Sequence, residues 1–155
     1  MATEKAIREA IAAKIQTAAP LAVVIPRNIL GIRQDAWLGM LQSSADNNRI
    51  RGWIVTEKAQ ALTEQRQSGA EYEMRFDVWQ FYEYFTGDNT TNSEDIFSAE
   101  REAVILAFTG DLVSPLTWAK PLDFSLIDIF PVGTGAMPIH IAQGSISVIN
   151  VAGCA

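Results

Sequence analysis

The most constraining feature of the sequence is an aromatic-rich stretch, EYEMRFDVWQFYEYF, which runs from Glu71 to Phe85. Polar and apolar residues alternate along it, and this alternation predicts a β-strand. At about 3.3 Å per residue the strand would reach roughly 50 Å. A domain of 155 residues has a diameter of only about 30–35 Å. The strand must therefore either bend sharply or project beyond the body of the protein.

The aromatic residues in the second half of this stretch change the pattern. Up to residue 78 the apolar side chains share one face, but beyond it they occupy both faces. Such a slip indicates a β-bulge or a strand that is buried on both sides. The cover is supplied either by the chain's own core or by a neighbouring subunit, since aromatic residues are enriched in interface cores. The candidate subunit-interface residues are Trp79, Phe81, Tyr82, Tyr84 and Phe85.

Two segments have the spacing of amphipathic helices. Apolar residues recur every fourth position near the N-terminus, between a capping threonine and a proline that ends the run. A second helix is predicted near residues 93–108, with a serine cap, acidic residues in its first turn and a glycine beyond its end. The residues that carry these predictions are Thr3, Ile7, Ile11, Ile15, Pro20, Ser93, Glu94, Asp95 and Gly110.

The remaining pattern predicts short strands on either side of the long one. The segment 59–70 is polar and is interpreted as the connection of a long antiparallel hairpin, and a bulge is expected at Gly144 in the last strand. The expected strands are residues 21–26, 49–58, 71–85, 122–130 and 139–151. Together these elements predict a single α+β domain over residues 1–155. Its mostly antiparallel sheet has a long β-hairpin and is flanked by the N-terminal helix and the second helix near residues 93–108.

Composition limits the classes of function. The formal charge of −6 and the isoelectric point near 4.7 are unsuited to gripping nucleic acid, which needs clustered Lys and Arg. No apolar run approaches the roughly 18–20 residues that cross a bilayer, so no membrane partner is expected. The N-terminus lacks the apolar core of a signal peptide. The single cysteine, Cys154, has no intramolecular disulfide partner.

No group of residues predicts an enzyme, a cofactor or a metal site. His140 is the single histidine and lacks partners at ligand spacing, which favours a structural or surface role. The GTGA segment at 133–136 lacks the third glycine and the helix of a dinucleotide-binding loop, which favours a hairpin turn. The acidic pairs are interpreted as solvated surface, and they are Glu100 with Glu102 and Glu71 with Glu73.

The layout resembles the tail terminator, or tail completion, proteins of long-tailed bacteriophages. The segments that carry the resemblance are the opening helix TEKAIREAIAAKI, the long hairpin through EYEMRFDVWQFYEY, the helix SEDIFSAEREAVILAF and the closing strand IHIAQGSISVINV. They match by order and length, since the family has no short signature. Residues 28–48 and 114–121 have no counterpart in the resemblance.

The resemblance implies a structural virion protein at the tail–neck junction, assembled in the cytoplasm of the bacterial host. Members form a hexameric ring that caps the tail tube, ends its elongation and meets the neck. The implied partners are other copies of the chain, the tail tube protein, the sheath in contractile tails, and a neck or stopper protein. DNA passes through the channel without specific binding, and an acidic lining suits such passage.

Two other functions remain open from the sequence. The first is another ring component of a phage neck or tail, such as a stopper or a tube-like protein. The second is a host α+β domain that binds a small ligand or assists an enzyme, with the aromatic residues lining a pocket.

Overall fold

The chain folds around one mostly antiparallel sheet, which confirms the predicted α+β class. The computed structural model describes residues 2–66, 69–110, 112, 115–116, 119–120 and 122–153. Its elements in chain order are α1 (Glu4–Ala18), β1 (Val23–Ile25), α2 (Gln34–Met40), β2 (Gln42–Ser43), the 3-10 helix η1 (Ser44–Asp46), β3 (Arg49–Arg66), β4 (Gly69–Glu83), α3 (Ser93–Ala107), β5 (Asp123–Val132) and β6 (Met137–Gly153).

Most of the aromatic stretch lies in β4, at the centre of the sheet, but the strand ends at Glu83, so Tyr84 and Phe85 follow it and the expected end at residue 85 was two residues too late. The strand order is β1-β3-β4-β6-β5, and the short β2 pairs with the start of β3. β1 lies parallel to β3, and every other pair is antiparallel. The predicted long hairpin consists of β3 and β4. On its other side β4 pairs with β6 along the whole length of β4. β4 therefore has a hydrogen-bonded neighbour on both sides.

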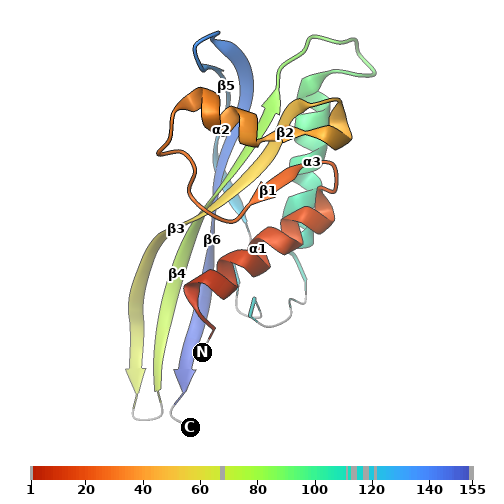
Figure 1. Ribbon diagram of the computed structural model, residues 1–155. Coiled ribbons are helices and arrows are strands. Elements are labelled where there is room, and N and C mark those ends of the chain that lie inside the picture. The colour runs from red at the N-terminus through yellow and green to blue at the C-terminus, as the bar shows by residue number, and fades with distance from the viewer. Residues whose placement is uncertain are drawn as a thin grey trace.

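The far ends of β3, β4 and β6 form a three-stranded arm, defined here as residues 59–66, 69–73 and 149–153. Figure 1 shows these strand ends extending beyond α1, away from the rest of the fold. The long hairpin thus projects beyond the body. Two register shifts interrupt β3, one between Glu57 and Ala59 and one between Leu62 and Glu64. Such shifts increase the local twist of a strand pair and so contribute to the shape of the arm.

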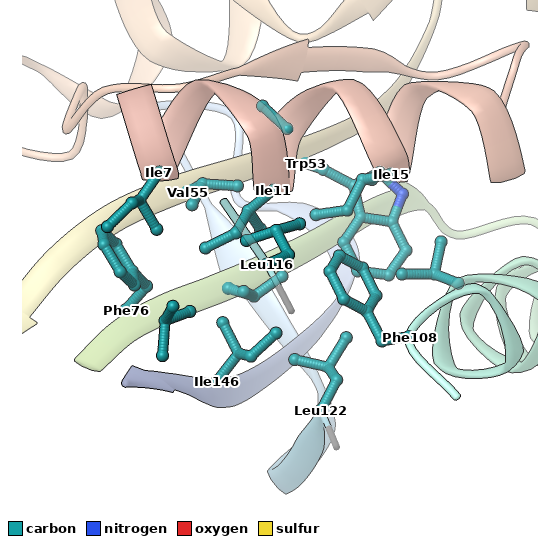
Figure 2. Close-up of a cluster of buried hydrophobic side chains, with 14 of the residues drawn as sticks. Ile7, Ile11, Ile15, Trp53, Val55, Phe76, Phe108, Leu116, Leu122 and Ile146 are labelled. Atoms are coloured by element: carbon teal, nitrogen blue, oxygen red, sulfur yellow. The ribbon is translucent and has the colours of Figure 1, made fainter. Parts of the chain in front are cut away.

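The N-terminal helix forms as its spacing predicts. The Oγ1 of Thr3 accepts a hydrogen bond from the backbone N–H of Ala6 at 3.1 Å, and the helix ends before Pro20. Its isoleucines point onto the sheet, where they meet residues of β3, β4 and β6 and the end of α3 (Figure 2). This first core includes Ile7, Ile11, Ile15, Trp53, Val55, Phe76, Val104, Phe108 and Ile146. Burying these apolar side chains on one sheet face holds α1 and α3 in place.

A second core lies on the opposite face of the same sheet. Here α2 contributes Trp37 and Leu38, which pack on side chains that alternate with those of the first core. The other members are Ile25, Ile29, Leu41, Ile50, Ile54, Phe81, Val132, Ile139 and Ile141. The pairing of β4 with β6 shows no register shift. The phase slip in the aromatic stretch therefore reflects a strand that is buried on both faces rather than a bulge in β4.

The predicted connection at residues 59–70 was wrong, because β3 continues to Arg66 and β4 begins at Gly69. The backbone pairing continues into the arm, with Ala61 opposite Glu73 and Gln65 opposite Ala70. The sequence of the segment shows no regular apolar alternation that would reveal a strand. Backbone pairing with β4 extends β3 through this segment instead.

Two local predictions also differ from the structure. The second helix is capped by Asn92, whose side chain accepts from the backbone N–H of Asp95 at 2.8 Å, and not by Ser93. The register shift near Gly144 lies in β5, between Phe124 and Leu126, and not in β6. A side chain at Gly144 would meet the carbonyl oxygen of Asp123 at 2.6 Å, so the glycine permits the close approach of the bulged strand.

Candidate assembly surface

The five candidate interface residues differ in burial. Phe81 and Tyr82 are almost fully buried within the chain, with 2% and 1% of their surface exposed. Trp79 and Phe85 are partly buried, and Tyr84 remains 40% exposed. The chain's own core thus covers two of the five side chains. Contact of these residues with a second subunit stays a prediction, and Trp79 and Tyr84 are the two best placed to make it.

A shallow groove lined by aromatic side chains opens beside α2. Trp37 packs on Phe81 with ring centroids 5.1 Å apart, and Trp79 stacks on Phe81 at 6.2 Å with the planes 11° apart. Across the groove stands Phe130 of β5, which is 37% exposed. The space measures about 400 Å³ and is also lined by Leu30, Gln34, Pro131, Val132 and Ile141. Such a groove suits the side chains of an apolar partner.

The outer strand β5 exposes apolar residues on both of its faces. Ile127 and Ile129 are 54% and 44% exposed on the α3 side, and Phe130 is exposed on the other side. Among the described residues β5 pairs only with β6, so the other edge of its backbone is free. A free edge with exposed apolar side chains is a template for pairing with another chain.

A buried polar network ties α3 to the sheet. The Nε of Arg51 donates to Glu100 Oε2 at 2.6 Å, and the Nε1 of Trp53 donates to Glu100 Oε1 at 2.8 Å. Arg51 also donates to Asp46 Oδ2 at 3.1 Å, and the hydroxyl of Tyr82 donates to the same oxygen at 3.1 Å. Glu100 is 7% exposed, so its interpretation as solvated surface was wrong. The helix spacing cannot show that its partners come from β3.

The network shifts the pKa values of two of the titratable groups that it contains. Burial works against the charge of Arg51, but the carboxylates of Glu100 and Asp46 outweigh it and raise the pKa of this guanidinium. Burial raises the pKa of the Tyr82 hydroxyl, and the charge of Asp46 adds to this. Both groups therefore keep their protons near neutral pH, and the network acts as a fixed set of hydrogen bonds rather than as a proton donor.

His140 has a structural place, as its isolation in the sequence indicates. It is 3% exposed, and its Nε2 lies 2.8 Å from the Oγ of Ser93. Its ring stacks on Phe97 at 5.0 Å and packs on Tyr84 at 5.5 Å. Burial lowers the pKa of this imidazole, opposed by the charge of Glu94 and assisted by that of Arg101. Ser93 in turn bonds to both backbone groups of Phe85, which fixes the strand end.

The GTGA segment forms the turn of the β5–β6 hairpin, as predicted. The backbone N–H and hydroxyl of Thr134 both donate to the carboxylate of Asp35, so this turn is fastened to α2. Those hydrogen bonds lower the pKa of Asp35. Gly133 has φ +80°, a conformation that glycine adopts without strain.

The remaining candidates give no chemical site. In the acidic pair on β4, Glu73 lies 3.5 Å from Arg75 and 3.6 Å from Lys120. Within the described ranges, no three His, Cys, Asp or Glu side chains are grouped so that they could hold a metal ion. None of the helices in the described part of the chain is long and apolar enough to cross a bilayer. Cys154 lies outside the described residues.

Comparison with solved structures finds a distant likeness to virion material. No family model matches the sequence, and no curated protein matches it. The chain is similar to a chain from the virion of a native gene transfer agent particle, at 17% identity over 93% of this chain and 95% of that one, with a TM-score of 0.44. What the chain does is therefore inferred from its own geometry.

Proposed function

We propose that this chain is a structural virion protein that forms a hexameric ring, caps a phage tail tube, ends its elongation and joins the tail to the neck. The observation that carries the proposal is the projecting arm together with the exposed apolar edge at β5. Ordering an arm that projects beyond α1 costs conformational entropy, and contact with another subunit would offset that cost.

The two edges of the sheet favour a ring over a two-fold dimer. One edge is β5, and the other is the part of β3 beyond its pairing with β1, which ends at Ile54. These edges differ in sequence and in length, so contact between them would be heterologous. A heterologous contact repeats from copy to copy and closes into a ring when the rotation allows.

The proposed partners follow from this role. The rim of the ring would face the tail tube on one side and a neck or stopper protein on the other, with the sheath added in contractile tails. DNA would pass through the channel unbound, in keeping with a net charge of −6. No chemical step belongs to this function.

The proposal predicts visible rings. The purified chain, imaged by negative-stain electron microscopy over a concentration series, should show sixfold rings with a central hole. Trp79→Ala and Tyr84→Ala together should reduce the fraction of rings about tenfold or more, because aromatic side chains contribute about 2 kcal/mol or more at interface centres. Leu106→Ala is the matched control, since Leu106 is 68% exposed on α3 and lies outside the aromatic groove.

Three outcomes would each contradict part of this proposal. A compact dimer that persists at every concentration would exclude a ring built by repeated heterologous contacts. Rings that survive the double substitution while circular dichroism shows an intact fold would remove the aromatic residues from the interface. Rings found at another position of the particle would favour a stopper or tube-like protein instead.

The aromatic groove favours one alternative from another class. A space of about 400 Å³ lined by two tryptophans and two phenylalanines can also hold a small apolar ligand, as in a ligand-binding or enzyme-accessory domain. A monomer whose melting temperature rises with a particular metabolite, and whose Trp37 or Trp79 fluorescence responds to it, would support that function over the ring.

A further inference from the structure

Arg101 is a cation with a buried, unsatisfied donor. Its guanidinium lies 4.9 Å from the ring centroid of Phe97 and 6.0 Å from that of Phe124. Its Nη1 is buried and has no hydrogen-bond partner among the described residues, and its Nη2 reaches only Ser98 Oγ, at 3.5 Å. A buried donor that lacks a partner costs free energy, and a charged donor costs more than a neutral one. Glu102 acts on Arg101 through its charge, but no carboxylate of the described residues bonds to Nη1, so this donor is available to a carboxylate from outside the chain.

The groove beside Arg101 shows where that carboxylate would enter. It lies between α3 and β5, measures about 330 Å³, and has Ile127 and Ile129 on its β5 side. These isoleucines point to the α3 side of the sheet, because Ile129 pairs with His140, whose ring packs on α3. Glu94 and Asp128 also line the groove, yet the ion pairs of the described residues join neither of them to Arg101. The groove is suited to a segment that carries a carboxylate beside apolar side chains.

The opposite edge of the same sheet carries such a carboxylate. Glu57 is exposed on β3, just beyond the part of that strand that β1 covers. Among the described residues it has no ion-pair partner, although its neighbour Lys58 pairs with Asp77 at 3.6 Å. By the alternation of the strand, Glu57 points to the same face as Val55, which packs under α1. Glu57 and Arg101 therefore lie on the same face of the sheet, at opposite edges.

The strand directions allow these two edges to meet. β3 is antiparallel to β4, β4 to β6, and β6 to β5, so β3 and β5 run in opposite directions. Through His140 and Tyr82, Ile129 lies level with Arg51, so Glu57 is six residues further along β3. A second copy in the same orientation, displaced by about 20 Å along the strands, would place its free β3 edge antiparallel to β5. The sheet would then continue across the contact with its faces preserved.

We infer that β5 of one copy pairs with the free β3 edge of the next copy, and that Glu57 of the incoming copy is the carboxylate that Arg101 receives. The inference rests on the ring proposed above and specifies its contact. Arg101 would gain a charge-assisted hydrogen bond, and Ile127 and Ile129 would be covered by the incoming strand. In a closed ring, the free β3 edge and the β5 edge of every copy would both be paired with a neighbouring copy.

A charge-exchange experiment tests the inference. Arg101→Glu and Glu57→Arg are made singly and together, and association is measured by sedimentation velocity and negative-stain imaging. Each single variant should weaken association about tenfold or more, because it places like charges in contact. The double variant should return to within about threefold of the wild-type chain, since the pair is restored in reverse. Arg101→Lys keeps the cation and should retain most of the association.

The controls separate this contact from general charge effects and from the ring itself. Arg27→Glu and Glu9→Arg make the same charge changes at exposed positions away from the groove and should leave association unchanged. If wild-type rings form and Arg101→Glu leaves them intact, the inference fails while the ring stands. Failure of the double variant to recover, with both single variants impaired and folded, also rejects the pairing. A wild-type chain that never associates rejects both.

Discussion

At the scale of single residues, the buried His140 makes a prediction about pH. Its folded-state pKa is lowered by burial, so the unfolded chain binds a proton more readily than the folded chain. The stability that His140 contributes should be complete above its unfolded pKa of about 6.5, and should be lost as the pH falls toward the folded pKa. Urea unfolding between about pH 8 and pH 5 should therefore show a falling free energy of unfolding.

His140→Gln isolates this contribution, because glutamine still offers a hydrogen bond to Ser93 and does not titrate. The difference in unfolding free energy between the wild-type chain and this variant should depend on pH most strongly below about pH 6.5. Nearby carboxylates titrate in both proteins and cancel in the difference. A difference that is constant across this range would show that His140 does not gain a proton on unfolding.

The residues that sequence reasoning placed wrongly are polar side chains whose partners lie far along the chain. Glu100 looks like one more acidic residue in a charged helix, and its bonds to Arg51 and Trp53 span 49 and 47 residues. The sequence did not single out Arg101 either. Its unsatisfied Nη1 and its position in the groove beside β5 are visible only in the folded chain. His140 was placed correctly, since the absence of ligand spacing is visible in the sequence itself.

At the scale of elements, Gly144 controls how β5 lies on the sheet. An added side-chain carbon there would meet the Asp123 carbonyl oxygen at 2.6 Å and the Phe124 ring at 2.9 Å. Moving backbone atoms costs more free energy than moving the end of a flexible side chain. Gly144→Ala should therefore displace the start of β5 and destabilise the fold by about 1–3 kcal/mol. Gly135→Ala is the matched control, because nothing lies within 4 Å of its added carbon.

Both glycine variants can be measured by urea denaturation and by hydrogen exchange of the β5 amides. Gly144→Ala should show faster exchange along β5 than the wild-type chain, whereas Gly135→Ala should leave β5 unchanged. Equal stability of the two variants would show that the strand shifts freely at this point. In that case β5 would be too loosely held to serve as the fixed edge for a neighbouring copy.

Helices and covered strands were predictable because burial imposes a period on their sequence. The stripe of Ile7, Ile11 and Ile15 gave α1, and the alternation up to Val78 gave the body of β4. The second half of β3 gave no such signal, because residues 59–66 show no regular apolar spacing in the sequence. The phase slip in the sequence indicated that Phe81 and Tyr82 are buried on opposite faces of the strand. The sequence did not show whether the residues that bury them belong to the same chain or to another subunit.

At the scale of the whole molecule, the fold divides into a body, which holds the core side chains that the structure describes, and the projecting arm. Among the described side chains, the first core reaches Met74 along β4 and Val148 along β6. If the arm serves assembly rather than folding, removing it should separate these two properties. The register supplies a clean place to cut, because Ala61 pairs with Glu73, and Glu73 with Ile149.

We expect an armless variant to fold but not to form rings. It replaces residues 62–72 with Asn-Gly, which favours a tight two-residue hairpin turn between the paired Ala61 and Glu73, and ends the chain at Ile149. Its melting temperature should fall by no more than about 5–8 °C, as for the loss of about 1–2 kcal/mol, because the buried clusters are kept. The control is a full-length variant in which the order of residues 62–66 is shuffled, so that the length and composition of the arm are kept. Rings formed by the armless chain would show that the sheet edges suffice for assembly, and a variant that fails to fold would show that the arm belongs to the folding unit.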